Sequence, residues 1–336
     1  MSSKRILSGM QPTNALHVGN YLGALKNWVA LQDQPGVECL FCVVDLHAIT
    51  VPYDRAMLAA NTREIAAAYI AAGIDVRKSA IFAQSSVKQH AEAMWLLATM
   101  TQIGKLDRMT QFKDKASKNA EKAGLGLYAY PVLMAADIMI YKATDVPVGD
   151  DQKQHVELAR DIAGTFNHRY GVDFFPEPRP LIMGETTRVM SLRDGTQKMS
   201  KSAESDMSRI NLADTPDMIA DKIKRAKSDA DVLPSEVAGL AGRSEAENLV
   251  AMYASLAGMT KADVLREYGG QGFGVFKPAL ADMTVSVLAP ISARLRELLT
   301  DHQTELDKIL HEGQKKAEAI AKPVVEEMLD IMGFWR

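Results

Sequence analysis

The sequence lacks several features that would assign it to a class at once. Its 336 residues include two cysteines, too few for a four-cysteine metal or iron–sulfur site. No apolar run approaches the ~20 residues that span a bilayer. No charged leader followed by an apolar core opens the chain, so no export signal is visible. These absences predict a cytoplasmic location and no membrane partner.

The two commonest glycine signatures of nucleotide binding are also missing. The chain has no G-x-x-x-x-G-K-[ST] phosphate loop, and no G-x-G-x-x-G follows the first predicted strand. The stretch GGQGFG at 269–274 falls among predicted helices and is interpreted as a loop. The net charge of −3 argues against a uniformly basic surface but permits a local basic stripe for nucleic acid. If the chain binds a nucleotide, it does so through a different sequence motif.

What is present is an ordinary globular composition, 47% apolar and 24% charged. A chain of this length is too long for a single hydrophobic core, so two packed domains are expected. Cys39 and Cys42 lie in the strand-like run VECLFCVVD, where residues three apart face opposite sides of a sheet. We interpret them as two buried thiols in a reduced compartment rather than as a redox pair.

The first half of the chain alternates strand-like and helix-like runs, which is typical of a parallel α/β sheet. Asp54 is a candidate N-cap, Gly73 a helix end and Pro131 a first helical residue. The polar, lysine-rich residues 103–127 predict an exposed insertion. Strands are predicted at 4–10, 37–45, 79–85 and 145–149, and helices at 19–32, 55–72, 90–100, 131–143 and 151–170.

Strand patterns stop at about residue 206, and helix-like runs with Gly and Pro breaks continue from there. The predicted fold class is therefore α/β: a Rossmann-like parallel-sheet nucleotide-binding domain followed by an all-helical C-terminal domain. We place the first domain at 1–205, with an inserted segment at about 103–145, and the second at 206–336. The last helix is expected to be able to pack back on the first domain.

Two separated segments can grip phosphate. In the first, QPTNALHVGN at 11–20, His17 and Asn20 lie three apart at a helix start and can face one anion beside the helix N–H groups. Gly19 leaves room for a base or ribose to approach. On its own this H-x-G-N is weak, since a histidine that caps an ordinary turn fits it better.

The second segment, GTQKMSKS at 195–202, carries Lys198 and Lys201 with few apolar anchors, which is typical of a mobile cationic loop. Composition alone favours a solvated linker. Together, however, the two segments form the paired signature of the class I aminoacyl-tRNA synthetases, which this chain resembles.

The resemblance implies that ATP activates an amino acid whose carboxylate attacks the α-phosphate and expels pyrophosphate. Catalysis is then mainly positioning and electrostatic stabilisation of phosphoryl oxygens. His17 and Asn20 would hold phosphate from one side, while Lys198, Lys201 and Ser202 would act from the other. No covalent nucleophile is needed, and none is assigned.

Further motifs resemble the bacterial tryptophanyl-tRNA synthetases in particular. Met134 and Asp137 share a helix face, with Tyr130 a turn earlier. An indole needs an apolar slot and one acceptor for its N–H, and the resemblance assigns that acceptor to Asp137. The neighbours of Asp137 are almost all apolar, so burial without a partner would cost several kcal/mol. The matching motifs are SGMQPT (8–13), VDLHAIT (44–50), RMTQFKDK (108–115), YPVLMAAD (130–137), VPVGDDQKQH (146–155) and GVFK (274–277).

The same resemblance implies the remaining contacts. Tyr130 and Gln152 would hold the α-amino group, and His47, Val146 and Val148 would line the pocket, although a structural histidine at a strand end fits His47 equally well. Mg²⁺ is expected with ATP, held by phosphate oxygens rather than by a protein site. The expected ATP contacts are Gln11, Pro12, Thr13, Gly19, Asn20, Gly149, Asp150, Asp151, Val189, Lys198, Met199, Ser200, Lys201 and Ser202, with Met199 against adenine.

Two other functions fit part of the pattern. A tyrosyl-tRNA synthetase-like enzyme shares both phosphate segments but would want a polar residue near Met134 for the phenol hydroxyl. A non-catalytic RNA-binding relative would have lost His17 or the lysine loop, and both are intact. The implied partners are L-tryptophan, ATP, tRNA(Trp) and a second copy in a homodimer. The tRNA anticodon would contact the helical domain, where Lys222, Lys224, Arg225 and Lys227 could face phosphate or simply solvent.

Overall fold

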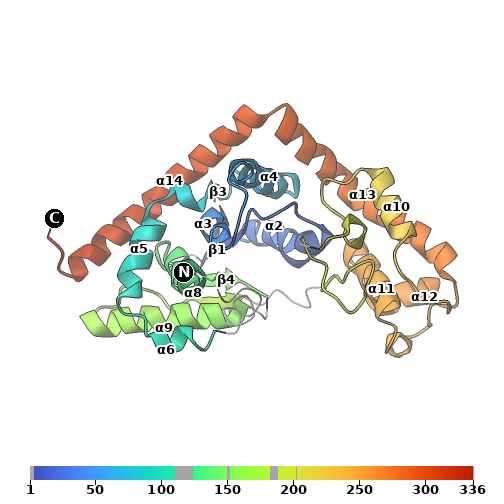
Figure 1. Ribbon diagram of the computed structural model, residues 1–336, viewed down its shortest axis with the longest axis horizontal. Helices are drawn as coiled ribbons and strands as arrows, with labels where there is room; N and C mark the ends of the chain where they lie inside the picture. The colour runs from blue at the N-terminus through green and yellow to red at the C-terminus, as the bar shows by residue number, and fades with distance from the viewer. Residues whose placement is uncertain (1–3, 110–123, 150–151, 182–187, 202, 336) are drawn as a thin grey trace.

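A five-stranded parallel sheet forms the centre of the computed structural model, which describes residues 4–109, 124–149, 152–181, 188–201 and 203–335 (Figure 1). The strand order is β3-β2-β1-β4-β5, so the chain builds outward from β1 on one side and then on the other. In open α/β sheets, this reversal leaves a crevice at the carboxyl ends of the two strands between which it occurs, here β1 and β4. The strands are β1 Lys4–Met10, β2 Val37–Val43, β3 Ala80–Ala83, β4 Asp145–Pro147 and β5 Arg179–Leu181.

Helices cover both faces of the sheet, as the apolar strands require. The first half contains α1 Val18–Asn20, a π-helical turn Tyr21–Leu25, α2 Lys26–Gln32, α3 Asp45–Ala48, α4 Leu58–Ala71, α5 Gln89–Ala98, α6 Ile103–Leu106, α8 Leu125–Met139 and α9 Lys153–Tyr170. Residues 203–335 contain no strand and form α10 Pro216–Lys224, α11 Ser244–Ala257, α12 Lys261–Tyr268, α13 Phe273–Thr300 and α14 Gln303–Ile331. Short 3₁₀ turns lie at Gln84–Ser86, Asp206–Ser208 and Val237–Leu240.

The two cysteines of β2 belong to two different hydrophobic clusters, one on each face of the sheet. Cys39 belongs to the apolar cluster that runs from α2 and α4 into α10, α11 and α13, whereas Cys42 belongs to the cluster under α5, α8, α9 and α14. Both thiols are buried and free, which confirms the interpretation of two structural cysteines on opposite faces. Burial raises the pKa of Cys39 to about 11 and that of Cys42 well above its ordinary value, so neither is a ready nucleophile.

The last two helices connect distant parts of the fold. In Figure 1, α13 runs from the cluster of α10, α11 and α12 toward α4, and α14 returns along the sheet beside β3 and α5. Gly313 of α14 lies directly on the carbonyl oxygen of Ile81 in β3, closer than any side chain would allow. By length and composition alone α13 could cross a membrane, but Phe276, Leu280 and Leu288 are fully buried against the neighbouring helices.

Three details differ from the sequence-based prediction. Pro131 does not open its helix but lies inside α8, which begins at Leu125 because the apolar run starts there. Asp54 is not an N-cap: its carboxylate accepts from the N–H of Ala56 in a turn, and α4 begins at Leu58. The strand β5 was not predicted because it has only three residues and contains Pro180. Residues 110–123 of the predicted insertion lie outside the described residues.

Candidate active site

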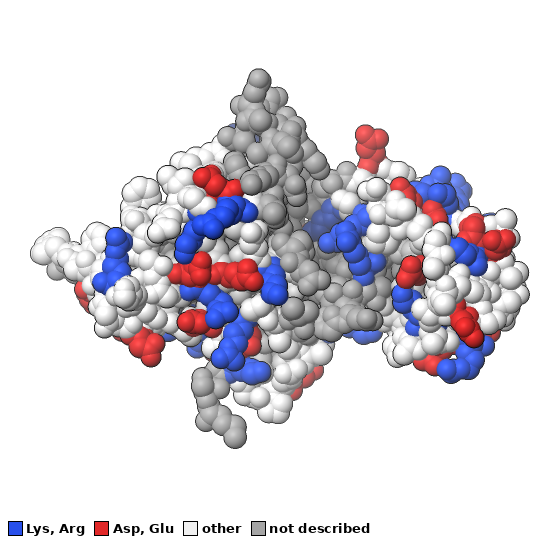
Figure 2. All heavy atoms as spheres, turned by 90° about the horizontal axis from the view of Figure 1, so that it is seen from below, with Lys and Arg blue, Asp and Glu red and all other residues white. Residues whose placement is uncertain are grey.

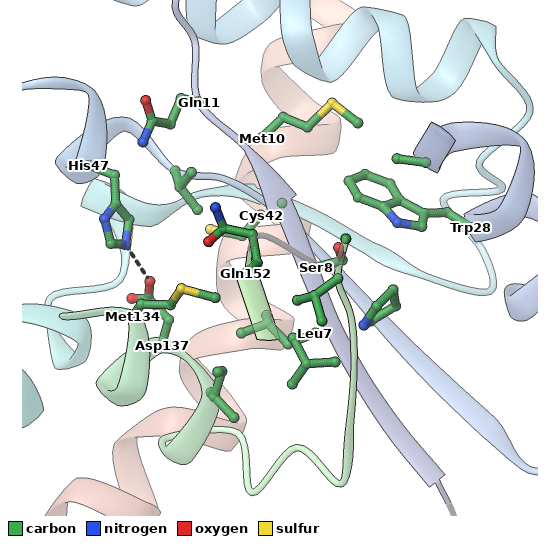
Figure 3. A pocket seen from close by; sticks show the side chains of 18 of the residues that line it. Leu7, Ser8, Met10, Gln11, Trp28, Cys42, His47, Met134, Asp137 and Gln152 are labelled. Atoms are coloured by element: carbon green, nitrogen blue, oxygen red, sulfur yellow. Dashed lines mark hydrogen bonds and ion pairs between the residues drawn. The ribbon is translucent and has the colours of Figure 1, made fainter. Parts of the chain in front are cut away.

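A cavity of about 480 Å³ lies at the crevice that the strand order creates (Figure 3). The end of β1, residues 7–11, forms one wall, and residues 146–149 at the end of β4 form another. The helix α8 and the start of the first helical segment, around Asn20 and Gly23, complete it. The fold alone therefore places a pocket where doubly wound sheets bind their ligands.

All seven residues predicted for the amino-acid pocket line this cavity. Tyr130, Met134 and Asp137 lie on one face of α8, because they are spaced by four and three residues. Figure 3 shows Met134 and Asp137 beside His47 and Gln152. The complete set is Tyr130, Met134, Asp137, His47, Val146, Val148 and Gln152.

Asp137 is 5% exposed and receives three hydrogen bonds from side chains. Its Oδ2 lies 2.8 Å from Nε2 of His47, and its Oδ1 lies 2.7 Å from Nε2 of Gln84 and 2.7 Å from Nδ1 of His90. His47 therefore has both a structural and a pocket-lining position. The sequence analysis missed Gln84 and His90; the position of Gln84 directly after β3, at the carboxyl edge of the sheet, was the available signal.

The Asp137 carboxylate is ionised in spite of its burial. Burial alone would raise its pKa, but the hydrogen bond from His47 and the attraction and hydrogen bond of His90 outweigh it. The pKa of Asp137 is therefore well below its ordinary range. The cavity thus holds a buried, negatively charged acceptor among apolar walls.

Tyr130 presents a neutral phenol at the same cavity. Its hydroxyl lies 3.0 Å from Nε2 of His155, which is 1% exposed and comes from α9. Burial raises the pKa of Tyr130 to about 12, so the phenol keeps its proton at neutral pH. A neutral hydroxyl with lone pairs suits a cationic amine better than another cation would.

The first phosphate segment folds as a capped helix start. Nδ1 of His17 accepts from the N–H of Gly19 at 3.1 Å, and Oδ1 of Asn20 accepts from the N–H of His17 at 3.1 Å. His17 thus does cap its turn, as the simpler interpretation held. Burial and the charges of Lys201, Arg209 and Lys198 lower its pKa to about 3, so its ring is neutral.

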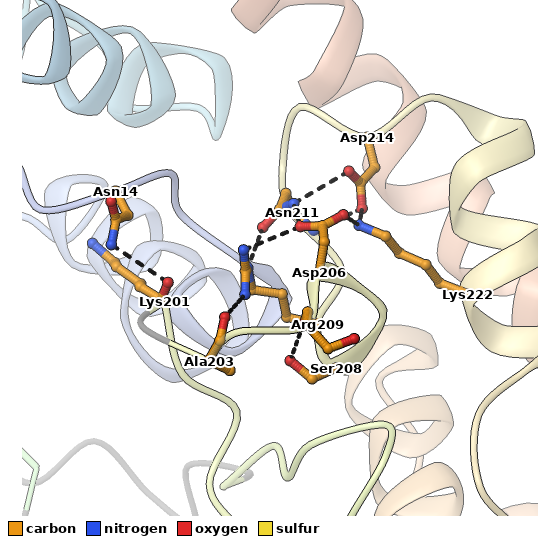
Figure 4. Close-up of polar contacts among 10 residues, drawn as sticks. Asn14, Lys201, Ala203, Asp206, Ser208, Arg209, Asn211, Asp214 and Lys222 are labelled. Atoms are coloured by element: carbon orange, nitrogen blue, oxygen red, sulfur yellow. Dashed lines mark hydrogen bonds and ion pairs between the residues drawn. The ribbon is translucent and has the colours of Figure 1, made fainter. Parts of the chain in front are cut away.

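The second segment, 195–202, contacts the first segment through Lys201 and is not a solvated linker at that residue. Nζ of Lys201 is 3.5 Å from the carbonyl oxygen of Gln11. Nδ2 of Asn14 is 3.4 Å from the carbonyl oxygen of Lys201 (Figure 4). Asn14 holds a left-handed backbone with φ 64° at this turn. Burial lowers the pKa of Lys201 to about 8, although Glu64 acts in the opposite direction.

The remaining predicted ATP contacts are distributed around this junction. Gln11, Asn20 and Gly149 line the cavity. Met199 is buried and donates its N–H to the carbonyl of Val189 at 3.1 Å, and Val189 packs beside Gly19. Outside the cavity wall lie Pro12, Thr13, Gly19, Val189, Lys198, Met199, Ser200 and Lys201. Asp150, Asp151 and Ser202 lie outside the described residues.

One member of the candidate phosphate-facing group on the helical part, Lys222, does not face solvent. Lys222 is 2% exposed, and its Nζ lies 2.6 Å from carboxylate oxygens of both Asp206 and Asp214 (Figure 4). Arg225 pairs with Asp221 in its own helix, and Lys227 pairs with Glu245. The prediction was wrong for Lys222 because the acids that bury it come from a preceding turn, not from its helix. Among the described residues, no cluster of three or more His, Cys, Asp or Glu side chains could hold a metal.

Comparison with known proteins gives full-length matches. The family described as tRNA synthetases class I (W and Y) matches residues 2–289. The tryptophan–tRNA ligase of Agrobacterium fabrum is 55% identical over 98% of this chain and 98% of its own. That of Caulobacter vibrioides is 56% identical over 98% of this chain and 96% of its own. The structure of tryptophanyl-tRNA synthetase from Campylobacter jejuni, complexed with ADP and tryptophan, is similar with a TM-score of 0.82 at 32% identity, covering 98% of this chain and 100% of that one.

Proposed function

The chain belongs to the class I tRNA synthetases of the tryptophan and tyrosine family, and from that premise we propose that it uses ATP to activate L-tryptophan and transfers it to tRNA(Trp). The reaction serves protein synthesis. In the geometry, the supporting observation is the buried carboxylate of Asp137 in a cavity that Gln11 and Asn20 of the first proposed phosphate segment also line, with Lys201 of the second segment beside Gln11.

We propose one orientation for tryptophan in the cavity. The indole lies between Met134, Val146 and Val148, with its ring N–H donating to Asp137. The α-ammonium group is held by the hydroxyl of Tyr130 and the side chain of Gln152, which both line the same cavity. The carboxylate is then directed toward the junction of the two phosphate segments, where ATP is held.

ATP is gripped by neutral donors on one side and cations on the other. Because Nδ1 of His17 already accepts from Gly19, the neutral ring carries its proton on Nε2 and can donate it to a phosphate oxygen. Lys198 and Lys201 supply positive charge as pyrophosphate separates, which lowers the barrier without any covalent nucleophile. Mg²⁺ accompanies ATP and is held largely by phosphate oxygens.

The decisive experiment is amino-acid-dependent exchange of pyrophosphate into ATP. Tryptophan should stimulate exchange strongly and tyrosine should not, because Met134 offers no polar partner to a phenol hydroxyl. Equal stimulation by both amino acids would contradict the specificity. No exchange with any amino acid would instead support the non-catalytic RNA-binding alternative.

We propose that one tRNA bridges the two subunits of a homodimer, with its anticodon contacting residues 206–336. The cluster of α10, α11 and α12 projects away from the sheet (Figure 1). In the face seen in Figure 2, blue and red atoms are intermixed over both parts rather than gathered in one basic stripe. On this face, individual phosphate contacts rather than a broad positive field would hold the tRNA.

We also propose that the enzyme is a cytoplasmic homodimer. Trp95, Ile103 and Leu125 are 70%, 68% and 77% exposed on α5, α6 and the first turn of α8, and α5 and α6 each pack against α8. Large apolar side chains so exposed are typical of a surface that a partner covers. Trp95→Lys should convert a dimer to monomers in sedimentation velocity, whereas Met57→Lys, at the exposed methionine that precedes α4, should not.

A further inference from the structure

Gln84 holds the Asp137 carboxylate from behind the cavity wall. It is fully buried, and its Oε1 accepts from the backbone N–H of Leu46 at 3.1 Å. Because a backbone N–H can only donate, this contact fixes which end of the carboxamide is which. The amide nitrogen must therefore be the group that lies 2.7 Å from Oδ1 of Asp137.

His90 reaches the same oxygen from α5. Its Nδ1 lies 2.7 Å from Oδ1 of Asp137, and its Nε2 lies 2.9 Å from the hydroxyl of Tyr141. An ionised carboxylate only accepts, so Nδ1 of His90 carries a proton. Burial raises the pKa of Tyr141, so its phenol keeps a proton that it can donate to Nε2. His90 is fully buried, and Phe82 stacks along its ring.

The two carboxylate oxygens are consequently unequal. Oδ1 receives donors from Gln84 and His90, neither of which lines the cavity, and two donors occupy the lone pairs of one oxygen. Oδ2 receives one donor, from His47, which does line the cavity. One acceptor position on Oδ2 therefore remains for a ligand, and Asp137 itself lines the cavity.

We propose that Gln84 and His90 are positioning residues for amino-acid recognition, which lock the Asp137 carboxylate so that only Oδ2 presents an acceptor to the indole N–H. This inference rests on the proposed function. Without the lock, the carboxylate could rotate about its side-chain bond, and the acceptor would lose its direction. The loss would fall on a ligand with a ring N–H and spare a ligand without one.

The test compares two substrates in the pyrophosphate exchange reaction of the full enzyme. L-Tryptophan carries the ring N–H, and 3-benzothienyl-L-alanine has sulfur in its place. The measured quantity is the ratio of the two kcat/KM values. Gln84→Leu and His90→Leu should each lower this ratio by about 10-fold through a higher KM for tryptophan, with the KM for ATP unchanged. His90→Asn, which can keep a donor near the Nδ1 position, should restore most of it.

The matched control is Gln89→Leu, because Gln89 precedes His90 in α5, is 2% exposed and makes no hydrogen bond to Asp137 among the described residues. It should leave the ratio unchanged. If His90→Leu does not fold, as judged by thermal unfolding, Gln84→Leu and Tyr141→Phe carry the test, and the latter should lower the ratio about 3-fold.

The outcomes separate this inference from the function on which it rests. A ratio that collapses in Asp137→Ala but is unchanged in Gln84→Leu and His90→Leu overturns the positioning role and leaves Asp137 as the indole acceptor. A ratio unchanged in Asp137→Ala as well removes Asp137 from indole recognition altogether. Equal losses for both substrates in the His90 variants would indicate a structural role only and also overturn the inference.

Discussion

Nδ1 of His17 accepts a hydrogen bond from the backbone N–H of Gly19, 3.1 Å away. This contact has two consequences. It fixes the tautomer of the neutral ring, with the proton on Nε2, and it requires the ring to stay neutral, because a protonated Nδ1 cannot accept. Burial, together with the charges of Lys201, Arg209 and Lys198, lowers the pKa of His17 from 6.5 to about 3.

The first prediction is that His17 makes the protein acid-sensitive. Between pH 6.5 and about 3 the unfolded chain protonates His17 and the folded chain does not, so the free energy of unfolding falls as the pH falls. His17→Asn, which can still cap the helix, should flatten this dependence. Urea unfolding at pH 7.5 and pH 5 measures it. The exposed His168→Asn variant is the control and should keep the wild-type slope.

The second prediction concerns Lys201 and ATP. With a pKa of about 8 in the free enzyme, the Lys201 ammonium loses its proton over a range close to physiological pH. Bound phosphate favours the charged form, so ATP binding should take up a proton above pH 8 and weaken as the pH rises. Calorimetry in buffers of different ionisation enthalpy detects the uptake. Lys201→Arg should abolish it, and uptake that persists in this variant would assign the proton to another group.

Local sequence patterns predicted those parts of the site that one element builds. Tyr130, Met134 and Asp137 share a face of α8 because of helical spacing, and the strand alternation placed Cys39 and Cys42 on opposite faces. The parallel sheet followed from alternating strand and helix runs. For the face of α8 and the two faces of β2, the relation is fixed by the geometry of a single helix or strand.

Contacts between distant elements could not be read in the same way. Gln84 and His90 are 53 and 47 residues from Asp137, and only packing of β3 and α5 against α8 brings them together. Lys222 looked like a surface lysine because its burial depends on Asp206 and Asp214, which a turn supplies from outside its helix. The spacing of residues in the sequence does not predict contacts between side chains of different helices, strands and turns.

The third prediction tests that buried lysine. Lys222→Met leaves the carboxylate of Asp214, itself 3% exposed, without its cation, which should cost about 3–5 kcal/mol of unfolding free energy. Lys224→Met, two residues later in the exposed part of α10, should change stability by less than about 0.5 kcal/mol. Adding Asp214→Asn to Lys222→Met should recover part of the loss. Equal effects of the two lysine substitutions would show that the pairing contributes nothing.

The fourth prediction concerns the contact that joins α14 to the sheet. A methyl group at Gly313 would overlap the backbone carbonyl of Ile81 in the edge strand β3, and a backbone carbonyl of a paired strand cannot move aside as a flexible side chain can. Gly313→Ala should therefore destabilise the protein by about 1–3 kcal/mol or more, although alanine is the better helix former. Thermal or urea unfolding of the full chain measures the loss.

Gly164 in α9 separates packing from helix propensity, because nothing lies within 4 Å of a methyl group built there. Gly164→Ala should stabilise the protein by about 0.5–1 kcal/mol through propensity alone. Opposite signs for two identical substitutions in two helices can arise only from the neighbours of each glycine. If Gly313→Ala were also stabilising, α14 could not be in contact with β3. Another element would then have to bury the sheet face that carries Phe82.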